Sequence, residues 1–188
     1  METLNGEKIN HLPDYEVKRL ALSDKLILVS QVGVNILFKQ KEDIASDEKR
    51  TLEELGIVAR EDSDLPETTQ FKELKTRLQF EIPRRKKDLR DVFTKAVKYV
   101  ETQDGSVRFG TKFRAIIKYP YESETGNFVL LGPIEAANKK IDDDGSTIIS
   151  YKSPVGRNVW GVKPDTEVEF KIPDGKARII VTDIFPKG

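Results

Sequence analysis

The chain lacks several residue types that common functional sites need. Among its 188 residues there is no cysteine, one histidine, one tryptophan and one methionine. Without cysteine, disulfides and thiolate metal sites are excluded. The single histidine, His11, has no companion residues in the sequence around it, so a histidine metal cluster is excluded and a Ser–His–Asp triad is not indicated. The composition therefore argues against the commonest forms of hydrolytic and zinc chemistry.

Net charge and long apolar runs are also lacking. The 32 acidic residues balance the 32 basic ones, so any attraction to nucleic acid must come from local patches. No apolar run approaches the roughly 20 residues that span a bilayer. The N-terminal stretch is polar and lacks the apolar segment of a signal peptide. We expect a cytoplasmic protein with no membrane partner. The sequence sets no oligomeric state, and a monomer is the working expectation.

Residues 31–100 follow a helical pattern, with apolar residues three, four or seven apart on one stripe of each of two segments. Each segment has about 33 residues, or roughly 50 Å at 1.5 Å per residue. A short turn between them predicts an antiparallel helical hairpin. Pro83 should kink the second arm, and Ser46-Asp47 should interrupt or weaken the first. The expected seam residues are Val34, Leu37, Ile44, Leu52, Leu55 and Val58, then Phe71, Leu74, Leu78, Ile82, Leu89, Val92, Phe93, Ala96 and Val100.

Beyond Asp104-Gly105 the apolar residues alternate, which is typical of strands. Ser153 should cap a short helix over 155–162, with Pro154 in its first turn. The fold class is therefore α+β: an arm at 1–30 that the sequence does not place, a hairpin at 31–100, and an antiparallel sheet domain at 106–188. The expected strands are 107–109, 113–117, 127–131, 147–150, 167–172 and 177–181, with a hairpin turn at 173–175.

The turn of the hairpin, 61–67, packs four carboxylates into seven residues. Residues 59–71 read AREDSDLPETTQF and match the pattern A-R-E-x-G-D-L-x-E-N-A-E-Y without a break in spacing. The later segment Val107–Gly110 matches V-x-F-G, and 149–168 follows I-S-x-x-S-P-x-A-R-x-L-x-G-x-x-x-G-D-x-V. In this order, the three motifs resemble the Gre-type family of bacterial transcript-cleavage factors. The resemblance covers about residues 30–185 and implies an FKBP-like fold for the C-terminal domain.

The resemblance implies a factor that is not itself an enzyme. It implies that bacterial RNA polymerase is the partner, that the acidic tip enters the secondary channel, and that the polymerase then cleaves the 3′ end of backtracked RNA. Asp64 and Glu67 would direct a second Mg²⁺ that is shared with the polymerase, and the chain would have no cofactor of its own. This suits a hard cation, which takes oxygen ligands and relies on substrate phosphates.

Further residues take roles from the same resemblance. Arg60, Phe71 and Lys75 would face the RNA, and the polymerase-binding set would be Lys152, Ser153, Pro154 and Arg157. The charge pattern agrees, because residues 53–67 hold six acids against one base, whereas residues 72–90 hold eight bases against three acids. The negatively charged tip could approach a metal ion while the positively charged helix next to it contacts RNA phosphates.

Simpler interpretations stand beside these. Asp64 and Glu67 around a proline are also an ordinary helix start. Arg84–Lys87 is more typical of a solvated helix face, and Asp142–Gly145 of a solvated turn than of a calcium loop. Trp160 is expected in the core or as a surface anchor. An FKBP-like isomerase or chaperone is a remote alternative that would need an aromatic-lined cleft.

Departures from the family pattern open a second function within the same class. Ser63 replaces the tip glycine, Pro66 stiffens the turn and Phe71 lacks the tyrosine hydroxyl. Lys152 stands where the family commonly has an acid, and this would alter docking on the polymerase. The alternative is a non-cleaving regulator or inhibitor that occupies the secondary channel. Because Asp64 and Glu67 are both present, the sequence favours stimulation of cleavage.

Overall fold

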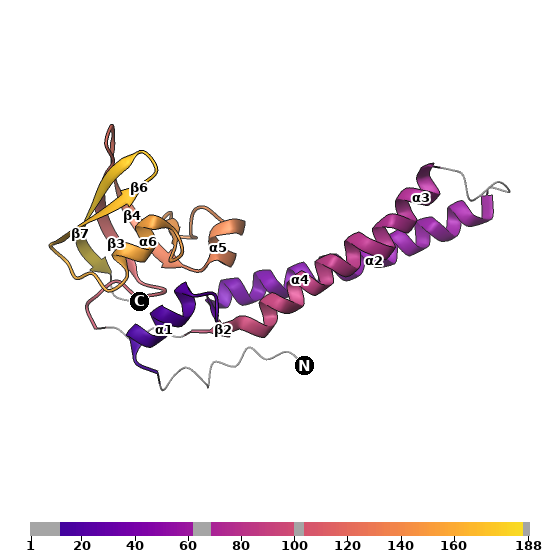
Figure 1. Ribbon diagram of the computed structural model, residues 1–188, viewed down its shortest axis with the longest axis horizontal. Coiled ribbons are helices and arrows are strands. Elements are labelled where there is room, and N and C mark those ends of the chain that lie inside the picture. Colours follow the sequence, from indigo (N-terminus) through magenta and orange to yellow (C-terminus); the bar gives the residue numbers. More distant parts are fainter. Residues whose placement is uncertain (1–11, 62–68, 100–103, 186–188) are drawn as a thin grey trace. The chain divides into compact units, whose positions relative to one another are not determined.

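The computed structural model describes residues 12–61, 69–99 and 104–185. The chain divides into two compact units. Residues 37–94 form a hairpin unit made of helices, and residues 3–36 with 95–188 form a sheet unit (Figure 1). The expected α+β class, a helical hairpin followed by a sheet domain with short helices, is confirmed.

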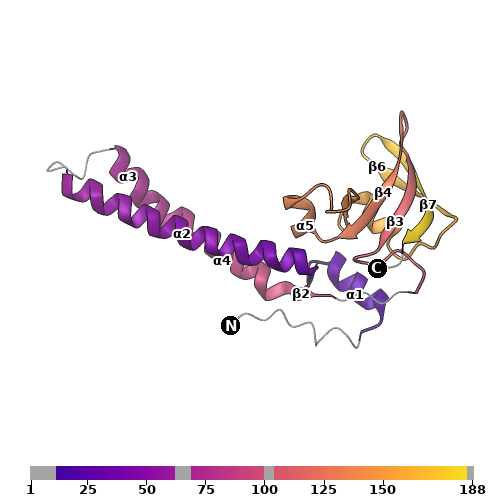
Figure 2. The same ribbon diagram turned by 180° about the vertical axis from the view of Figure 1, so that it is seen from behind.

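The hairpin has one unbroken arm and one arm in three pieces. The first is α2 (Gln31–Glu61), so the predicted interruption at Ser46-Asp47 is wrong. The second consists of α3 (Thr69–Thr76), a π-helix (Arg77–Glu81) and α4 (Ile82–Lys95). Figures 1 and 2, seen from opposite sides, both show these pieces running alongside α2. Residues 62–68, which connect the two arms in the sequence and contain most of the expected acidic turn, lie outside the described residues.

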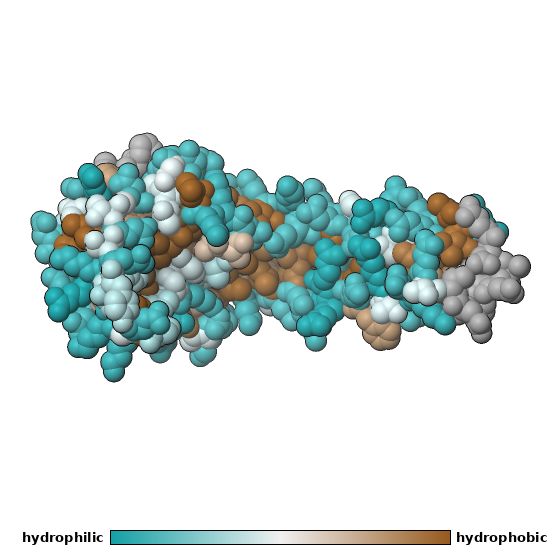
Figure 3. Space-filling model, turned by 90° about the horizontal axis from the view of Figure 1, so that it is seen from above, coloured by the Kyte–Doolittle hydropathy of each residue, from teal (hydrophilic) through white to brown (hydrophobic). Residues whose placement is uncertain are grey.

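The seam between the arms differs from the apolar prediction at one place. Leu37, Ile44, Leu74 and Ile82 are buried as expected, and Phe38 packs edge-on against Phe93. Leu52, however, is 54% exposed, whereas its neighbour Thr51 is fully buried together with Asp47. Helical spacing places residues 44, 47 and 51 on one face, so two polar residues occupy the middle of the seam. Figure 3 shows hydrophobic residues along the hairpin between hydrophilic flanks.

A π-helix precedes Pro83 in the second arm, and the kink expected at Pro83 stays a prediction. A proline lacks the N–H that would bond to the carbonyl four residues earlier, and its ring crowds that carbonyl. In the π-helix just before Pro83, backbone hydrogen bonds join residues five apart instead of four: the Ile82 N–H donates to the Arg77 carbonyl. An extra residue in one turn also keeps Leu74 and Ile82, eight residues apart, on the same buried face.

At its base, the hairpin is bounded by two short parallel strands. β1 (Ile27–Val29) precedes α2, and β2 (Ala96–Lys98) follows α4, with Ile27 opposite Ala96. Ala96 is therefore a strand residue and was wrongly assigned to the helical stripe. The run from Ala96 to Tyr99 is rich in β-branched and aromatic side chains, which favour strands.

The main sheet has five strands in the order β5-β4-β3-β7-β6. Most neighbours are antiparallel, but β4 and β5 are parallel, so the sheet is mixed rather than wholly antiparallel. The reason is the connection through α5, since a crossover that contains a helix can return the chain in the same direction. The strands are β3 (Lys112–Lys118), β4 (Ser123–Leu131), β5 (Thr147–Ser150), β6 (Thr166–Ile172) and β7 (Gly175–Phe185).

Three short helices complete the sheet unit: α1 (Asp14–Leu22), α5 (Pro133–Asn138) and α6 (Pro154–Val159). The predicted strand at 107–109 is wrong. Val107 instead exchanges two backbone hydrogen bonds with the loop after α6, to the Val162 carbonyl and from the Gly161 N–H. Trp160 is 5% exposed and stacks edge-on against Tyr151, which confirms its expected place in the core.

The unplaced N-terminal arm contributes α1 to this unit. Val17 and Ala21 are buried in the same core cluster as the sheet. The Lys18 ammonium donates to the Trp160 carbonyl at 2.6 Å, and burial lowers the pKa of Lys18. Asp14 forms an ion pair with Arg108. Residues 12–22 are therefore fastened to the sheet unit by apolar burial and by two polar contacts.

A buried carboxylate lies at the start of α2. Glu135 is fully buried and accepts a 2.7 Å hydrogen bond from the Ser30 N–H, while the Ser30 hydroxyl accepts from Gly33. A carboxylate at the N-terminal end of a helix interacts favourably with the helix dipole. A Cβ at Gly33 would lie 2.3 Å from the Glu135 carboxylate, so the glycine leaves the space that the acid fills.

Candidate functional site

The proposed metal-directing pair, Asp64 and Glu67, lies outside the described residues. The structure does describe the helix ends on either side of it. Arg60 is exposed in the last turn of α2, and Lys75 is exposed in the last turn of α3. Phe71 is half-buried, so it packs partly against the protein. The roles of these five residues stay predictions.

The cap of α6 is built as expected, but the helix ends at Val159, three residues before the predicted end at 162. Ser153 caps the helix: its hydroxyl accepts a 3.0 Å hydrogen bond from the Gly156 N–H and donates to the Ser150 carbonyl. Pro154 occupies the first turn and is exposed, and Arg157 is exposed on the same short helix. Gly156 has no alternative, because a Cβ there would lie 2.0 Å from the Ser150 carbonyl oxygen. The cap therefore fixes Pro154 in an outward-facing position.

The Lys152 side chain is mostly buried and has a charged partner. It forms an ion pair with Asp24, and its side chain is 21% exposed. Burial and the nearby Arg157 lower the pKa of Lys152. Asp24 adopts a positive φ of 59° in the turn after α1. The charge reversal noted in the sequence is thus offset by an acid that the N-terminal segment supplies.

A recess of about 400 Å³ adjoins Pro154. Tyr121, in the turn between β3 and β4, is 93% exposed beside it. The sequence prediction missed this tyrosine as a surface residue, although an aromatic inside Pro120-Tyr121-Glu122 was a usable signal, since turns favour small and polar residues. The full lining is Tyr119, Pro120, Tyr121, Glu122, Pro154, Val155, Ile172 and Asp174.

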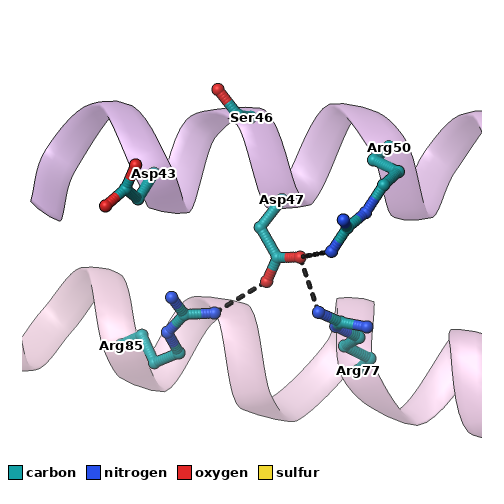
Figure 4. Close-up of a pocket in the computed structure, with 6 residues that line it drawn as sticks. All are labelled: Asp43, Ser46, Asp47, Arg50, Arg77 and Arg85. Atoms are coloured by element: carbon teal, nitrogen blue, oxygen red, sulfur yellow. Dashed lines mark hydrogen bonds and ion pairs between the residues drawn. The ribbon is translucent and has the colours of Figure 1, made fainter. Parts of the chain in front are cut away.

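The hairpin carries a second polar site around Asp47 (Figure 4). The Asp47 side chain, 9% exposed, accepts hydrogen bonds from Arg77 at 2.6 Å, Arg85 at 2.7 Å and Arg50 at 3.0 Å. Arg77 and Arg85 come from the opposite arm. The hydrogen bond from Arg77 is the main cause of a lowered Asp47 pKa. The carboxylate is therefore held ionised between the arms.

The basic run Arg84–Lys87 divides between two roles. Arg85 binds Asp47, and Lys86 donates to both oxygens of Glu48 at 2.5 and 2.6 Å. Arg84 is exposed and lies 3.9 Å from Asp88 on its own helix. Two of the four bases thus join the arms instead of forming a purely solvated face.

No group of three or more acidic or histidine side chains within residues 12–61, 69–99 and 104–185 could hold a metal ion. The aspartates of 142–144 are paired with lysines: Asp144 and Asp142 with Lys112 at 2.7 and 3.1 Å, and Asp143 with Lys139. The hydrogen bond from Lys112 lowers the pKa of Asp144 to about 2. In the described part of the chain, no helix is long and apolar enough to cross a membrane.

Comparison with known proteins gives one family match and one curated relative. Residues 102–186 match the model of the family "Transcription elongation factor, GreA/GreB, C-term". The chain is 24% identical over 166 residues to the transcription elongation factor GreA of Roseiflexus castenholzii, and the match covers 87% of this chain and 99% of the relative.

Solved structures cover most of this chain but superpose on it with low TM-scores. The GreA factor homolog 1 (Gfh1) of Thermus thermophilus is 20% identical with a TM-score of 0.35, covering 86% of this chain and 99% of that one. A GreA/GreB elongation factor from Nitrosomonas europaea is 20% identical with a TM-score of 0.30, covering 85% and 97%. The likeness to this family rests on the two sequence matches.

Proposed function

We propose that the chain acts as a divergent Gre-like transcription elongation factor, which the two sequence matches support, that it binds bacterial RNA polymerase, and that it directs its acidic hairpin tip into the secondary channel. There it stimulates Mg²⁺-dependent cleavage of backtracked RNA by the polymerase. The factor supplies no complete active site of its own.

One observation gives the strongest support to the proposed binding of RNA polymerase. The Ser153 cap holds Pro154 outward at the rim of a recess lined by Tyr119 and Tyr121. Exposed aromatic side chains beside a rigid backbone are the kind of surface on which partners find their anchor residues. We assign this face, with Arg157 at its edge, to polymerase contact.

The cleavage part depends on Asp64 and Glu67. Mg²⁺ keeps several waters and binds proteins through one or two carboxylates together with substrate phosphates. Two tip carboxylates therefore suit a metal that the polymerase and the RNA also hold. The second metal would activate a water and stabilise the leaving oxygen at the 3′ end of the transcript. Arg60 and Lys75, both exposed on the flanking helices, would contact RNA phosphates.

A non-cleaving regulator is the second candidate. The observation that favours it is the tip sequence, where Ser63 replaces a glycine and Pro66 restricts the turn. Serine pays a steric cost at positive φ that glycine avoids. A tip held in another conformation would occupy the channel without positioning a metal.

The docking surface is tested by measuring affinity for the cognate polymerase. We expect the double variant Ser153→Ala/Pro154→Ala to bind at least tenfold more weakly. Because loss of the cap also destabilises α6 by about 1 kcal/mol, Tyr121→Ala serves as a second variant in which packing is unaffected. Lys163→Ala, exposed in the loop after α6, is the matched control. Unchanged affinity in both test variants would exclude this surface.

The activity is tested on a backtracked elongation complex with 3′-labelled RNA and Mg²⁺. Wild type should release short 3′ fragments, whereas Asp64→Ala and Glu67→Ala should bind the complex and fail to cleave. If wild type binds and blocks nucleotide addition without releasing fragments, the second candidate holds.

A further inference from the structure

The arginine cluster on the hairpin surrounds a recess as well as a carboxylate. Arg50, Arg77 and Arg85 converge on Asp47, and together with Asp43 and Ser46 they line a recess of about 450 Å³. The side chains of the three arginines are 64%, 36% and 49% exposed. Their guanidinium groups are thus anchored on one side and open to solvent on the other.

Hydrogen-bond donors remain in excess after the anchoring. A guanidinium has five N–H donors in a planar fork. Among the described residues, each arginine donates one hydrogen bond to Asp47. The lining itself holds three positive charges and the two negative charges of Asp47 and Asp43, and Arg50 also lies 3.9 Å from Glu54. Hydrogen bonds between guanidinium forks and phosphate oxygens are among the strongest in proteins, because both partners are charged and the geometry is bidentate.

The π-helix brings two of these arginines to one face. Arg77 and Arg85 are eight residues apart, which in a regular helix turns them about 80° away from each other. The extra residue of the π-helix reduces the separation to about two full turns. Both side chains then reach the same carboxylate, one to each oxygen. π-helical turns occur frequently at functional sites.

We propose that this recess is a binding site for a compact phosphate-class anion, such as inorganic pyrophosphate or the diphosphate of a free nucleotide. Arg77 and Arg85 clamp the anion from the second arm, and Arg50 closes the site from α2. Asp47 sets the directions of the three guanidinium groups and competes with the anion for their donors.

The surroundings favour a compact anion over a nucleic-acid strand. Residues 42–54 of α2 hold six acids (Glu42, Asp43, Asp47, Glu48, Glu53 and Glu54) and two bases (Lys49 and Arg50). A nucleic-acid strand that followed this part of α2 would pass these carboxylates and be repelled. A small anion meets the three guanidinium groups inside the recess, where the positive charge is concentrated.

The test is isothermal titration of full-length protein with pyrophosphate, without divalent metal and at constant ionic strength. Arg77→Gln and Arg85→Gln should each raise the dissociation constant at least tenfold. Arg84→Gln is the matched control, since Arg84 lies on the same helix outside the recess, and it should leave binding unchanged. Asp47→Asn should tighten binding several-fold, because it removes the competing carboxylate. Helix content by circular dichroism checks that each variant is folded.

The opposite signs make the outcome decisive. If Asp47 only held the arginines in place and did not compete with the anion, Asp47→Asn would weaken pyrophosphate binding, as the Arg77→Gln and Arg85→Gln variants do. That result would overturn the proposal. Equal losses of affinity in Arg84→Gln and Arg85→Gln would also overturn it. A final arm replaces pyrophosphate with a short single-stranded RNA. If the RNA binds through Arg77 and Arg85 and pyrophosphate does not, the site belongs to a strand and the proposal fails. No polymerase is used, so these results are independent of the proposed function.

Discussion

The two units of the molecule are held together in different ways. The sheet unit buries side chains from α1, β1, five strands and the loops between them in one cluster. The hairpin unit has a single seam, and midway along it the buried positions are Asp47 and Thr51 instead of apolar residues. Stability in the sheet unit is spread over many mutually packed side chains, whereas the middle of the hairpin relies on one charged network.

The charged network contributes to the alignment of the two arms more than to their stability. A buried ion pair contributes little net stability compared with apolar packing, but it is costly to break. Such a network fixes the alignment of the two arms, since Asp47 is bonded to the opposite arm at two points. The following variants test the contrast, from the largest expected effect to the smallest.

Phe113→Ala should have the largest effect. Phe113 is fully buried in β3 and packs against Phe128, with ring centroids 5.8 Å apart. Removing a buried phenyl group costs about 3–5 kcal/mol. Hydrogen exchange of the sheet amides should show this loss of unfolding free energy. Tyr121→Ala, at an exposed ring, should change it by less than about 0.5 kcal/mol. A loss that appeared equally in the hairpin would show that the two units unfold together.

Asp47→Asn should destabilise the hairpin unit by about 1–3 kcal/mol, because three guanidinium groups lose a charged acceptor. The partial exposure of the arginines limits the cost. Exchange of α2 and α4 amides should therefore accelerate while exchange of the sheet amides does not. Asp88→Asn, which removes an exposed acid 3.9 Å from Arg84, is the control and should have almost no effect. Equal effects of the two variants would contradict the assigned importance of Asp47.

Acid should loosen the hairpin unit through the same residue. The folded state lowers the pKa of Asp47 below its ordinary value of 3.8, with the Arg77 hydrogen bond as the main cause. The stabilisation is therefore fully present above this value and is lost as the pH falls below it towards the folded-state pKa. Hairpin exchange rates, corrected for intrinsic pH dependence, should rise in wild type as the pH falls below about 4. Asp47→Asn should remove that part of the rise.

Gly56→Ala should have the smallest effect and the opposite sign. Gly56 lies within α2, and a Cβ there would meet nothing within 4 Å. Alanine is favoured over glycine in a helix interior by about 0.5–1 kcal/mol, so thermal unfolding of the hairpin should shift upward. In the sheet unit, Gly161→Ala should do the reverse, since Gly161 has a φ of 93°. A destabilised Gly56→Ala variant would contradict the open surface at this position.

Much of the sheet unit could be predicted because alternation of apolar residues reports directly on burial in strands. The strand at Thr147–Ser150 was found in this way. The Ser153 cap was found from a different signal, a serine followed by proline at a helix start. The parallel pairing of β4 and β5 could not be found, because strand direction depends on the crossover and not on local pattern. Glu135 also escaped, since a buried carboxylate next to a helix start looks like a surface acid in the sequence.

The hairpin shows the opposite limitation. Its two arms were evident from periodicity, but the apolar pattern between Ile44 and Leu55 was completed with Leu52, which is exposed. The seam there is polar, and the arginines that make this possible lie thirty and thirty-eight residues away in the chain. Hydrophobicity alone cannot indicate a buried aspartate whose partners come from another helix. The π-helix was missed for a related reason: Pro83 marked an irregularity but not its form.

The parallel pair β1–β2 joins the chain where it enters and leaves the hairpin, with Ile27 opposite Ala96. Topologically, the hairpin is thus an insertion into the sheet unit, closed at its base by the pair. Equal numbers of residues can be removed from, or added to, both arms without altering the points of attachment. The cost of a longer closed loop grows only slowly with its length. Hairpin length is therefore a quantity that evolution or an engineer can adjust in whole heptads, leaving the sheet unit untouched.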